Sequence, residues 1–387
     1  MTGLFNDSYP PIVDGVALTV QNYAYWLHKK NRPVCVVTVK SPDVRSDDDA
    51  AFPVYRYTSV PLLIRKPFRI GLPMVDFSYR RTIDAIPFTL IHAHCPFAAG
   101  YEALRIARKR RIPLVATFHS KYRDDFERAV HSKQIAQWMV KQVIAFYEQA
   151  DEVWIPQPAV EATIRAYGYK GRVTVVGNGT DLSAAGADAD RIKQQAREAL
   201  QIPRDRPVLL FIGQHIWEKN PRLILDALAL MKETPFQLFF IGAGYAAREM
   251  QELTDKIGLS DKVAFLGMIL DRELLKRYYA AADLFLFPSL YDNAPLVVRE
   301  AAAMHTPSLL LKDSTAAEII TDGYNGFLSA HTREAFAGRI RSLIAAPETL
   351  AQAGRNAANT IARSWESVAD EVIDRYSQLI ARYAATH

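Results

Sequence analysis

The chain has 387 residues, which is enough for two domains that each bury a large core. With 49% hydrophobic and 23% charged residues, its composition is that of an ordinary water-soluble globular protein. No apolar run approaches the ~20 residues that span a bilayer, and no charged-then-apolar leader opens the chain, which favours a cytoplasmic protein over an integral membrane or secreted one. In a reducing cytoplasm we expect Cys35 and Cys95 to be small buried residues, not a disulfide or a metal site.

The net charge of +5 is unevenly distributed along the chain. Residues 1–170 hold 23 Lys and Arg against 16 Asp and Glu, a net charge of +7, whereas the remainder carries −2. Runs of basic residues are usually solvated surface, and that interpretation of the excess charge stays open. The alternative is attraction to anionic lipid at a membrane surface, at about 1 kcal/mol per nearby cation. Nucleic acid is disfavoured, because no nucleic-acid motif with interleaved aromatic residues occurs. The excess lies in the clusters Arg65-Lys66-Pro-Phe-Arg69, Arg80-Arg81 and Arg105-Ile-Ala-Arg108-Lys-Arg-Arg111.

The first half of the chain, to about residue 176, alternates short apolar runs with longer helical patterns, the rhythm of a doubly wound parallel sheet. Helical periodicity predicts helices from about Leu18 to Lys29 and from about Phe126 to Gln149. The run Asp47-Asp48-Asp49 is interpreted as a solvated loop and not as a metal triad. The predicted strands are Gly3–Phe5, Val34–Val39, Val54–Tyr57, Leu90–Ala93, Leu114–Phe118, Glu152–Ile155 and Val173–Val176.

Polar side chains follow several of these strands, where an open α/β sheet binds its ligand. Asp14 and Gly15 lie at the mouth of the first predicted helix, although a plain turn would explain them equally. His92 and His94 point to one face of a strand, but no third metal ligand appears at convincing spacing. His119 ends a strand at the carboxyl edge, and a lone histidine there is more often structural than catalytic.

The second half repeats the alternation after a polar, alanine-rich connector at 183–206, which we predict to be helical. A strand beginning at Val208 runs into Gly213-Gln214-His215 and then Glu218-Lys219-Asn220. Two further strands end in glycine turns, which are commonly structural only. The chain closes with an amphipathic helix after Trp365. The two glycine turns are Phe239-Phe-Ile-Gly242-Ala-Gly244 and Val263-Ala-Phe-Leu-Gly267-Met268-Ile269.

The stretch from Ala282 to Met304 has the strongest functional pattern. The short apolar run Ala282–Phe287 is typical of a buried parallel strand, and Leu296–Met304 is predicted to be a helix. The first amides of that helix, at Leu296 and Val297, would attract an anion, phosphate above all.

Two acidic residues flank this helix start. Glu300 lies one turn along the same face as Leu296, roughly 6 Å further on, where a ribose diol could donate two hydrogen bonds to it. Asp292 lies in the loop on the other side, free to bind a second hydroxylated group. The spacing suits a molecule built as ribose, pyrophosphate and sugar. The alternative is a helix cap at Asp292 and an ordinary helical glutamate at Glu300.

Pro288-Ser289, Asp292, Glu300-Ala301, Thr306-Pro307 and Asp322-Gly323-Tyr-Asn325-Gly326 together resemble the donor site of family 4 retaining glycosyltransferases of GT-B architecture (glycosyl transferases group 1), near the diacylglycerol glucosyltransferases. Matched segments occur in order over nearly the whole chain. The resemblance implies an α/β fold of two Rossmann-like, doubly wound parallel-sheet domains that face each other across a cleft. Residues 1–176, completed by a C-terminal helix at 366–387, would form the acceptor side, and residues 177–365 would bind the nucleotide sugar.

The resemblance also implies roles at matching positions. Catalysis is expected to depend on His119 and Asp292, which would contact the donor sugar, and on Lys219, which would grip the pyrophosphate. On the acceptor side the expected residues are Asp14, His94, Lys121 and Arg123. The expected donor contacts are Gly15, Gly213, Gln214, Lys219, Met268, Ile269, Asp292, Asn293, Ala294, Leu296, Val297 and Glu300. This architecture generally needs no metal, so we expect no metal site and no cofactor, the nucleotide sugar being a substrate.

Three positions depart from the family pattern. Asp292 stands where family members carry Glu, which shifts the sugar contact by one methylene or marks a different donor sugar. Gln214 stands where the family has Arg, and a neutral amide cannot offset phosphate charge. His215, or a cation from the first domain, is the candidate to compensate. Asp14 precedes Gly15 where many members have two glycines.

The implied reaction moves a hexose from a nucleotide diphosphate sugar to an acceptor with retention of anomeric configuration. UDP-glucose or a related UDP-hexose is the first choice of donor, and GDP-mannose the second. The basic first half favours a lipid or glycan acceptor and peripheral attachment to the inner face of a membrane; in lipid-modifying relatives the region of the helix from Phe126 can dock there. Two alternatives stay open: an isomerase like UDP-N-acetylglucosamine 2-epimerase, and an inactive sugar-nucleotide-binding subunit, motivated by Gln214.

Overall fold

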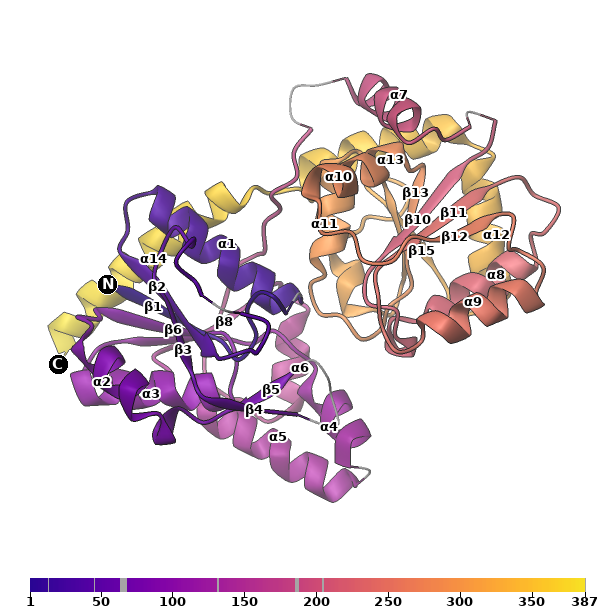
Figure 1. The fold of residues 1–387 in the computed structure, drawn as a ribbon. Coiled ribbons are helices and arrows are strands. Elements are labelled where there is room, and N and C mark those ends of the chain that lie inside the picture. The colour runs from indigo at the N-terminus through magenta and orange to yellow at the C-terminus, as the bar shows by residue number, and fades with distance from the viewer. Residues whose placement is uncertain are drawn as a thin grey trace. The chain divides into compact units, whose positions relative to one another are not determined.

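The computed structural model describes residues 1–12, 14–44, 46–62, 68–130, 132–184, 188–203 and 205–386. The chain forms two compact units (Figure 1). The N-terminal unit comprises Met1–Asn178 and Trp365–His387, and the C-terminal unit comprises Gly179–Ser364. Each unit is built on its own parallel sheet with helices packed against it, as the alternation of strands and helices predicts.

The sheet of the N-terminal unit has seven strands in the order β3-β2-β1-β6-β7-β8-β9, all paired in parallel. The chain adds β2 and β3 on one side of β1 and then returns to place β6 on the other side. The strand order therefore reverses between β1 and β6, where an open sheet offers a crevice at its carboxyl edge. These strands are β1 (Thr2–Phe5), β2 (Val34–Val39), β3 (Val54–Tyr57), β6 (Leu90–Ala93), β7 (Leu114–Thr117), β8 (Glu152–Ile155) and β9 (Val173–Val175).

Helices and one small hairpin complete the N-terminal unit. The last helix of the chain packs on the first, where the Trp365 and Tyr23 rings lie 5.9 Å apart edge to face and Lys30 Nζ lies 2.8 Å from Asp370 Oδ1. The helices are α1 (Gly15–Lys29), α2 (Phe77–Ala85), α3 (Ala98–Arg110), α4 (Tyr122–Val130), α5 (Lys133–Tyr147), α6 (Val160–Ala166), α14 (Trp365–Thr386) and the 3-10 turn η1 (Pro73–Val75). The antiparallel hairpin pairs β4 (Ser59–Pro61) with β5 (Arg69–Gly71).

The sheet of the C-terminal unit has six parallel strands in the order β12-β11-β10-β13-β14-β15, and its order reverses between β10 and β13. The strands are β10 (Val208–Ile212), β11 (Gln237–Ile241), β12 (Val263–Phe265), β13 (Leu284–Phe287), β14 (Ser308–Leu311) and β15 (Phe327–Ser329). The helices are α7 (Ala189–Ala199), α8 (Pro221–Ala229), α9 (Ala247–Lys256), α10 (Arg272–Ala281), α11 (Leu296–Ala303), α12 (Arg333–Ile344) and α13 (Pro347–Thr360), with 3-10 turns η2 (Trp217–Lys219) and η3 (Thr315–Ile319).

The central strands explain why their sequences are continuously apolar. Every residue of β2, β6, β7, β10, β13 and β14 is buried, because helices cover both faces of a parallel sheet. The two sheets carry separate hydrophobic cores, one in each unit. Cys35 and Cys95 are buried free thiols, as predicted. In the described ranges, none of the helices combines the length and apolar character that crossing a bilayer requires.

Most predicted elements are confirmed, including all seven strands of the first half and the closing helix, and the connector predicted at 183–206 contains the helix α7. The first helix begins at Gly15, earlier than predicted, because Asp14 Oδ1 accepts from the backbone amides of Val16 and Ala17. The single helix predicted from Phe126 to Gln149 is wrong. It is two helices, α4 and α5, because the Ser132 hydroxyl caps a new helix start by accepting from Ile135 N.

Candidate functional site

The reversal of strand order in the C-terminal unit brings two predicted site residues together. The loop after β10 ends in Lys219, and the loop after β13 contains Asp292; both loops leave neighbouring strands at the same edge. Lys219 Nζ lies 2.7 Å from Asp292 Oδ1 and 3.0 Å from Oδ2. The Ser289 hydroxyl donates to Asp292 Oδ2 at 2.7 Å and accepts from Asp292 N at 3.3 Å. The loop therefore holds the carboxylate against the lysine.

Asp292 is not a helix cap, so that alternative is excluded. The N-cap position of α11 is Pro295, whose side chain forms no capping hydrogen bond. The amides of the first turn, at Leu296 and Val297, therefore donate no hydrogen bond to the side chain of the N-cap residue, and the helix dipole adds partial positive charge there. Ala294 and the buried Asn293 complete the loop that leads to this helix start.

Glu300 is not an ordinary surface glutamate either. It lies on α11 with only 5% of its surface exposed. Arg272 Nη2 donates to Glu300 Oε1 at 2.8 Å, and the Tyr279 hydroxyl donates to Oε2 at 2.7 Å. Arg272 Nε also donates to Asp181 Oδ2 at 3.0 Å. Sequence reasoning missed these partners, because α10 and the loop at Asp181 meet α11 only in the folded unit.

Glycines allow the loops at the ends of β10, β11 and β12 to pack closely. A Cβ on Gly242, which has a φ of +140°, would lie 1.9 Å from the carbonyl oxygen of Gly213. Gly213 N donates to Ile241 O, and Gly242 N donates to Gly267 O. Met268 is 57% exposed directly after this turn, and Ile269 is half-buried. The segment after Gly267, which was predicted to contact the base, therefore lies at the surface of the unit.

The two residues after Gly213 behave differently from each other. Gln214 is exposed. His215 is 1% exposed and packs edge to face against the rings of Phe240 and Phe265. Burial lowers the pKa of His215 to about 4, so it carries no charge at neutral pH. The idea that His215 compensates for the missing arginine is therefore wrong: it faces the core and is neutral.

In the N-terminal unit, the reversal point between β1 and β6 gathers histidines. His94 follows β6 and His119 follows β7; His94 Nδ1 lies 3.1 Å from His119 Nε2, and their rings stack. The His92 ring stacks on His94 with centroids 4.0 Å apart. His92 Nδ1 contacts the Tyr376 hydroxyl at 2.5 Å, and its Nε2 contacts the Thr117 hydroxyl at 2.7 Å. Sequence reasoning did not find Tyr376, which comes from the closing helix.

These imidazoles are neutral at physiological pH. Burial lowers the pKa of His119 to about 3, and burial together with the neighbouring histidines lowers the pKa values of His92 and His94. Among the described residues, no group of three or more His, Cys, Asp or Glu side chains is arranged to hold a metal ion. The edge is therefore suited to hydrogen bonding with a neutral polar ligand.

The remaining acceptor-side candidates lie near the same edge. Asp14 caps α1, and a Cβ on the adjacent Gly15 would meet no atom within 4 Å, so the helix mouth is open. Lys121 is half-buried just before α4. The Arg123 guanidinium lies 4.9 Å from the Tyr167 ring centroid and donates to Ala166 O at 3.1 Å. Arg123 is thus engaged with the end of α6.

Solved structures define the fold class of the chain. Sucrose-phosphate synthase from Thermosynechococcus elongatus matches with a TM-score of 0.83 at 23% identity, covering 98% of this chain and 99% of that one. Anabaena Alr3699/HepE, solved in complex with UDP-glucose, matches with a TM-score of 0.77 at 19% identity, covering 97% and 99%. At these identities the likeness establishes the fold, which is GT-B.

Family models give the activity. The model of Glycosyltransferase Family 4 matches residues 13–184, and that of Glycosyl transferases group 1 matches residues 192–360. The chain belongs to the family 4 glycosyltransferases, as its motifs predicted, and it is a glycosyltransferase. It is 28% identical over 359 residues to alpha-monoglucosyldiacylglycerol synthase of Streptococcus pneumoniae, covering 89% of this chain and 79% of the relative. It is 29% identical over 323 residues to D-inositol 3-phosphate glycosyltransferase 2 of Catenulispora acidiphila, covering 76% and 71%.

Proposed function

We propose that this glycosyltransferase moves a hexose from a nucleotide diphosphate sugar, UDP-glucose or a related UDP-hexose, to a lipid or glycan acceptor at a membrane surface, with retention of configuration. The observation that carries the proposal is the convergence of Lys219, the start of α11 and the buried Glu300 in one unit. Lys219 and the amide dipoles at the start of α11 suit a diphosphate, and the carboxylate of Glu300 suits the hydroxyls of a ribose.

In this proposal the donor exchanges partners within the site. The diphosphate binds at Leu296 and Val297 and takes Lys219 from Asp292. Asp292, released from the ion pair, accepts hydrogen bonds from hydroxyls of the sugar. Lys219 stabilises the charge that develops on the leaving diphosphate, which is where a fixed cation contributes most to rate.

The contacts of the carboxylates bear on the route by which the proposed retention would occur. Glu300 already accepts hydrogen bonds on both oxygens, and Asp292 is held by Lys219 and Ser289. The carboxylate of Asp181 shares Arg272 with Glu300, so we assign none of these three carboxylates the nucleophile role that a retaining glycosidase gives to one of its two carboxyl groups. We therefore propose attack of the acceptor on the same face as the departing diphosphate, without a metal. Unchanged turnover in excess EDTA is the expected result for this part.

The names of the relatives guide the choice of substrates. One relative is a glucosyltransferase of diacylglycerol by name, and a structural neighbour was solved with UDP-glucose, which support UDP-glucose before GDP-mannose and a lipid acceptor before a soluble one. Thermal-shift measurements with UDP, GDP and their sugars test the donor directly. We expect stabilisation by UDP and UDP-glucose that Glu300→Ala abolishes. An unchanged shift in that variant would discard the assignment of ribose to Glu300.

A cluster of exposed apolar side chains in the N-terminal unit supports membrane attachment. Phe77 is 81% exposed, Met74 69% and Val75 62%, at η1 and the start of α2. Exposed apolar groups at this density are uncommon on a soluble surface and mark an interaction site. The segment 54–83 that contains them holds one acidic residue, Asp76, which is buried. The other members of this apolar cluster are Val60, Ile70 and Leu72 on and after the β4–β5 hairpin.

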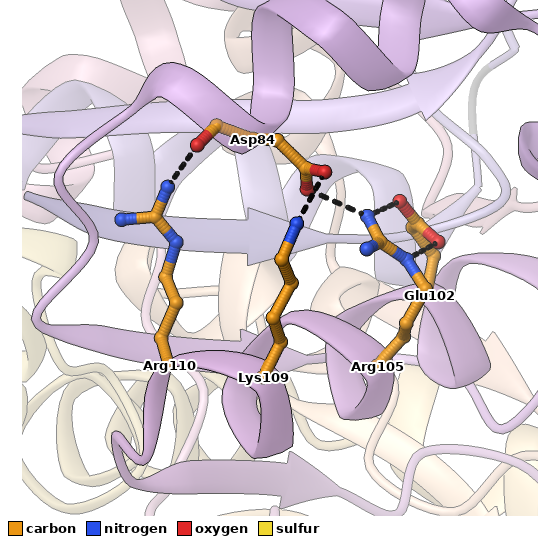
Figure 2. A network of polar contacts seen from close by, with 5 residues as sticks. All are labelled: Asp84, Glu102, Arg105, Lys109 and Arg110. Atoms are coloured by element: carbon orange, nitrogen blue, oxygen red, sulfur yellow. Dashed lines mark hydrogen bonds and ion pairs between the residues drawn. The ribbon is translucent and has the colours of Figure 1, made fainter.

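Only part of the basic charge that the sequence emphasised is available to a membrane beside this apolar cluster. On α3, Lys109 Nζ lies 2.7 Å from Asp84 Oδ2 (Figure 2). Arg105 binds Glu102 Oε1 at 2.7 Å and Asp84 Oδ1 at 3.1 Å, and Arg110 donates to the Asp84 carbonyl. Most cations of that cluster therefore have acidic or carbonyl partners within the unit. Arg80 and Arg81 on α2 are the cations that we assign to anionic lipid; Arg65 and Lys66 lie outside the described residues.

Membrane attachment is tested by liposome flotation of Phe77→Ser. We expect the wild-type protein to float with vesicles that contain anionic lipid and the variant to float several-fold less, because a highly exposed ring has little role in the fold and much in lipid insertion. Leu230→Ser, which alters a 42% exposed residue of the C-terminal unit, is the matched control and should float normally. If both variants floated equally, the apolar cluster would not be the site of membrane attachment.

A product assay separates transfer from the two alternatives. Incubation with UDP-glucose and diacylglycerol vesicles is expected to release UDP and form a glycolipid. Epimerised free nucleotide sugar would reject transfer in favour of isomerisation, and tight UDP binding without turnover on any lipid or glycan would identify an inactive sugar-nucleotide-binding subunit.

A further inference from the structure

The carboxylate of Glu300 is held from two directions by a single helix. Arg272 and Tyr279 lie about two turns apart on α10, hence on one face, and each donates to a different oxygen of Glu300. Tyr279 is fully buried, whereas the Arg272 side chain is 38% exposed. The clamp therefore reaches from the core of the unit to its surface, and Glu300 lies between its ends.

The Arg272 guanidinium has no freedom to turn. Its Nε and Nη2 both bind the carboxylate of Asp181, in a side-on, two-point contact. Nη2 also donates to Glu300 Oε1. Since Nη2 carries two hydrogens, both are used, one for each acid. A lysine has the charge but not the planar fork that such a geometry needs.

Electrostatics explains why an arginine stands at this position. The Glu300 side chain is 7% exposed and that of Asp181 is 41% exposed, so water solvates the second carboxylate but not the first. A buried carboxylate is stable only when a cation and hydrogen-bond donors replace the water it has lost. Arg272 supplies the cation to Glu300, and Asp181 keeps Arg272 in place.

The clamp leaves a defined pair of acceptor positions. A carboxylate has about four lone-pair sites, two on each oxygen. Arg272 occupies one on Oε1 and Tyr279 occupies one on Oε2, which leaves one on each oxygen. Two acceptors on adjacent oxygens of a fixed carboxylate match the two hydroxyl donors of a vicinal diol.

We propose that Arg272 is a positioning residue for the nucleotide: together with Tyr279 it orients Glu300 so that the carboxylate receives both hydroxyls of a ribose and discriminates against 2′-deoxynucleotides. The inference rests on the proposed assignment of ribose to Glu300 and adds the residues that make this contact specific. Asp181 acts indirectly, because it holds the Arg272 guanidinium in place.

The test compares the affinities of UDP and 2′-deoxy-UDP for the full-length protein by isothermal titration calorimetry. A hydrogen bond to a charged group contributes about 1.5–3 kcal/mol, so wild-type protein should bind UDP about tenfold or more tightly than 2′-deoxy-UDP. In Arg272→Met and Arg272→Lys this ratio should fall to about twofold or less. Arg277→Met makes the same change at an exposed position of α10 and should keep the wild-type ratio.

Tyr279→Phe guards against a variant that fails to fold, because it removes one hydroxyl and keeps the ring in its packing. It should lower the ratio partially. An unchanged ratio in folded Arg272→Met or Arg272→Lys would overturn the inference while UDP binding, and with it the proposed function, stands. Wild-type protein that binds UDP without distinguishing the deoxy analogue would overturn the inference and the ribose assignment together. Wild-type protein that binds neither UDP nor GDP would overturn the proposed function itself.

Discussion

The two units have sheets of the same winding but present opposite chemistry at the carboxyl edge. In the N-terminal unit, the strands next to the reversal point end in stacked, neutral histidines. In the C-terminal unit they end in ion pairs, Lys219 with Asp292 and, from α10, Arg272 with Glu300. One edge is suited to neutral hydroxyl groups and the other to a charged, diphosphate-bearing ligand. The difference agrees with the proposal that the C-terminal unit binds the nucleotide diphosphate.

The largest expected effect comes from removing the cation at the charged edge. Lys219→Met should lower kcat/KM for UDP-glucose by about 100-fold or more, because a fixed group that stabilises leaving-group charge contributes on that scale. Release of UDP in the presence of lipid vesicles is the measurement. Lys232→Met, outside the site, should retain wild-type turnover. If kcat/KM of Lys219→Met fell by less than about threefold, the charged edge of the C-terminal unit would have no special role in binding the diphosphate, and the contrast between the two units would fail.

Asp292→Asn should separate binding from turnover. In the unliganded protein the Asp292 carboxylate neutralises Lys219, so its removal frees the cation for phosphate. We expect UDP to bind several-fold more tightly and turnover of UDP-glucose to fall by about tenfold or more, because the sugar loses its charged acceptor. Calorimetry with UDP and steady-state turnover are measured on the same preparation. Weaker UDP binding by the variant would contradict the exchange of partners proposed for Lys219.

Gln214→Arg sharpens the charged edge instead of removing it. Gln214 is exposed after β10, so an arginine fits without cost to the core. A charge-assisted bond to phosphate is roughly twice as strong as a neutral one, and UDP affinity should rise by about threefold to tenfold. Gln195→Arg on α7 controls for the added charge. If both substitutions raised UDP affinity equally, the gain would come from long-range attraction between added positive charge and UDP, and not from a bond between residue 214 and phosphate.

The histidine edge should make the N-terminal unit sensitive to acid. In the unfolded chain histidine takes up a proton below about pH 6.5, whereas burial keeps the pKa of folded His119 at about 3. The unfolded state therefore binds more protons between these pH values, and stability falls as pH drops, by about 1.4 kcal/mol per pH unit for each such histidine. His119→Gln should reduce the slope of unfolding free energy against pH between 6 and 4. The exposed His28→Gln should leave it unchanged, and a slope unaffected by His119→Gln would contradict this reading of the edge.

Much of the fold was predictable because its signals are local. Buried parallel strands are continuous apolar runs, and glycines mark the loops, so the strands of the first half and the α/β class could be read from the sequence. The break between α4 and α5 was missed because apolar periodicity continues through it, and only the Ser132 cap marks the new start. His215 was misjudged because sequence does not say which way a loop side chain points.

The site residues also fall into those that the sequence predicted and those that it did not. Asp292, Lys219 and Glu300 belong to motifs with recognisable spacing, and the fold brings the first two into contact. Arg272 and Tyr279 belong to no recognised motif, because their role depends on α10 lying against α11. The ion pairs of the α3 cations with Asp84 could not be predicted either, because a run of like charges in a sequence does not indicate which acidic residues lie next to it in the fold.

The most direct test of the central claim is a crystal structure of the protein soaked with UDP-glucose. The account predicts difference density for the diphosphate at the start of α11, with Lys219 turned from Asp292 to a phosphate oxygen and the ribose hydroxyls on Glu300. A diphosphate bound elsewhere, with the Lys219–Asp292 and Arg272–Glu300 pairs as they are in the unliganded protein and no ligand beside them, would contradict it.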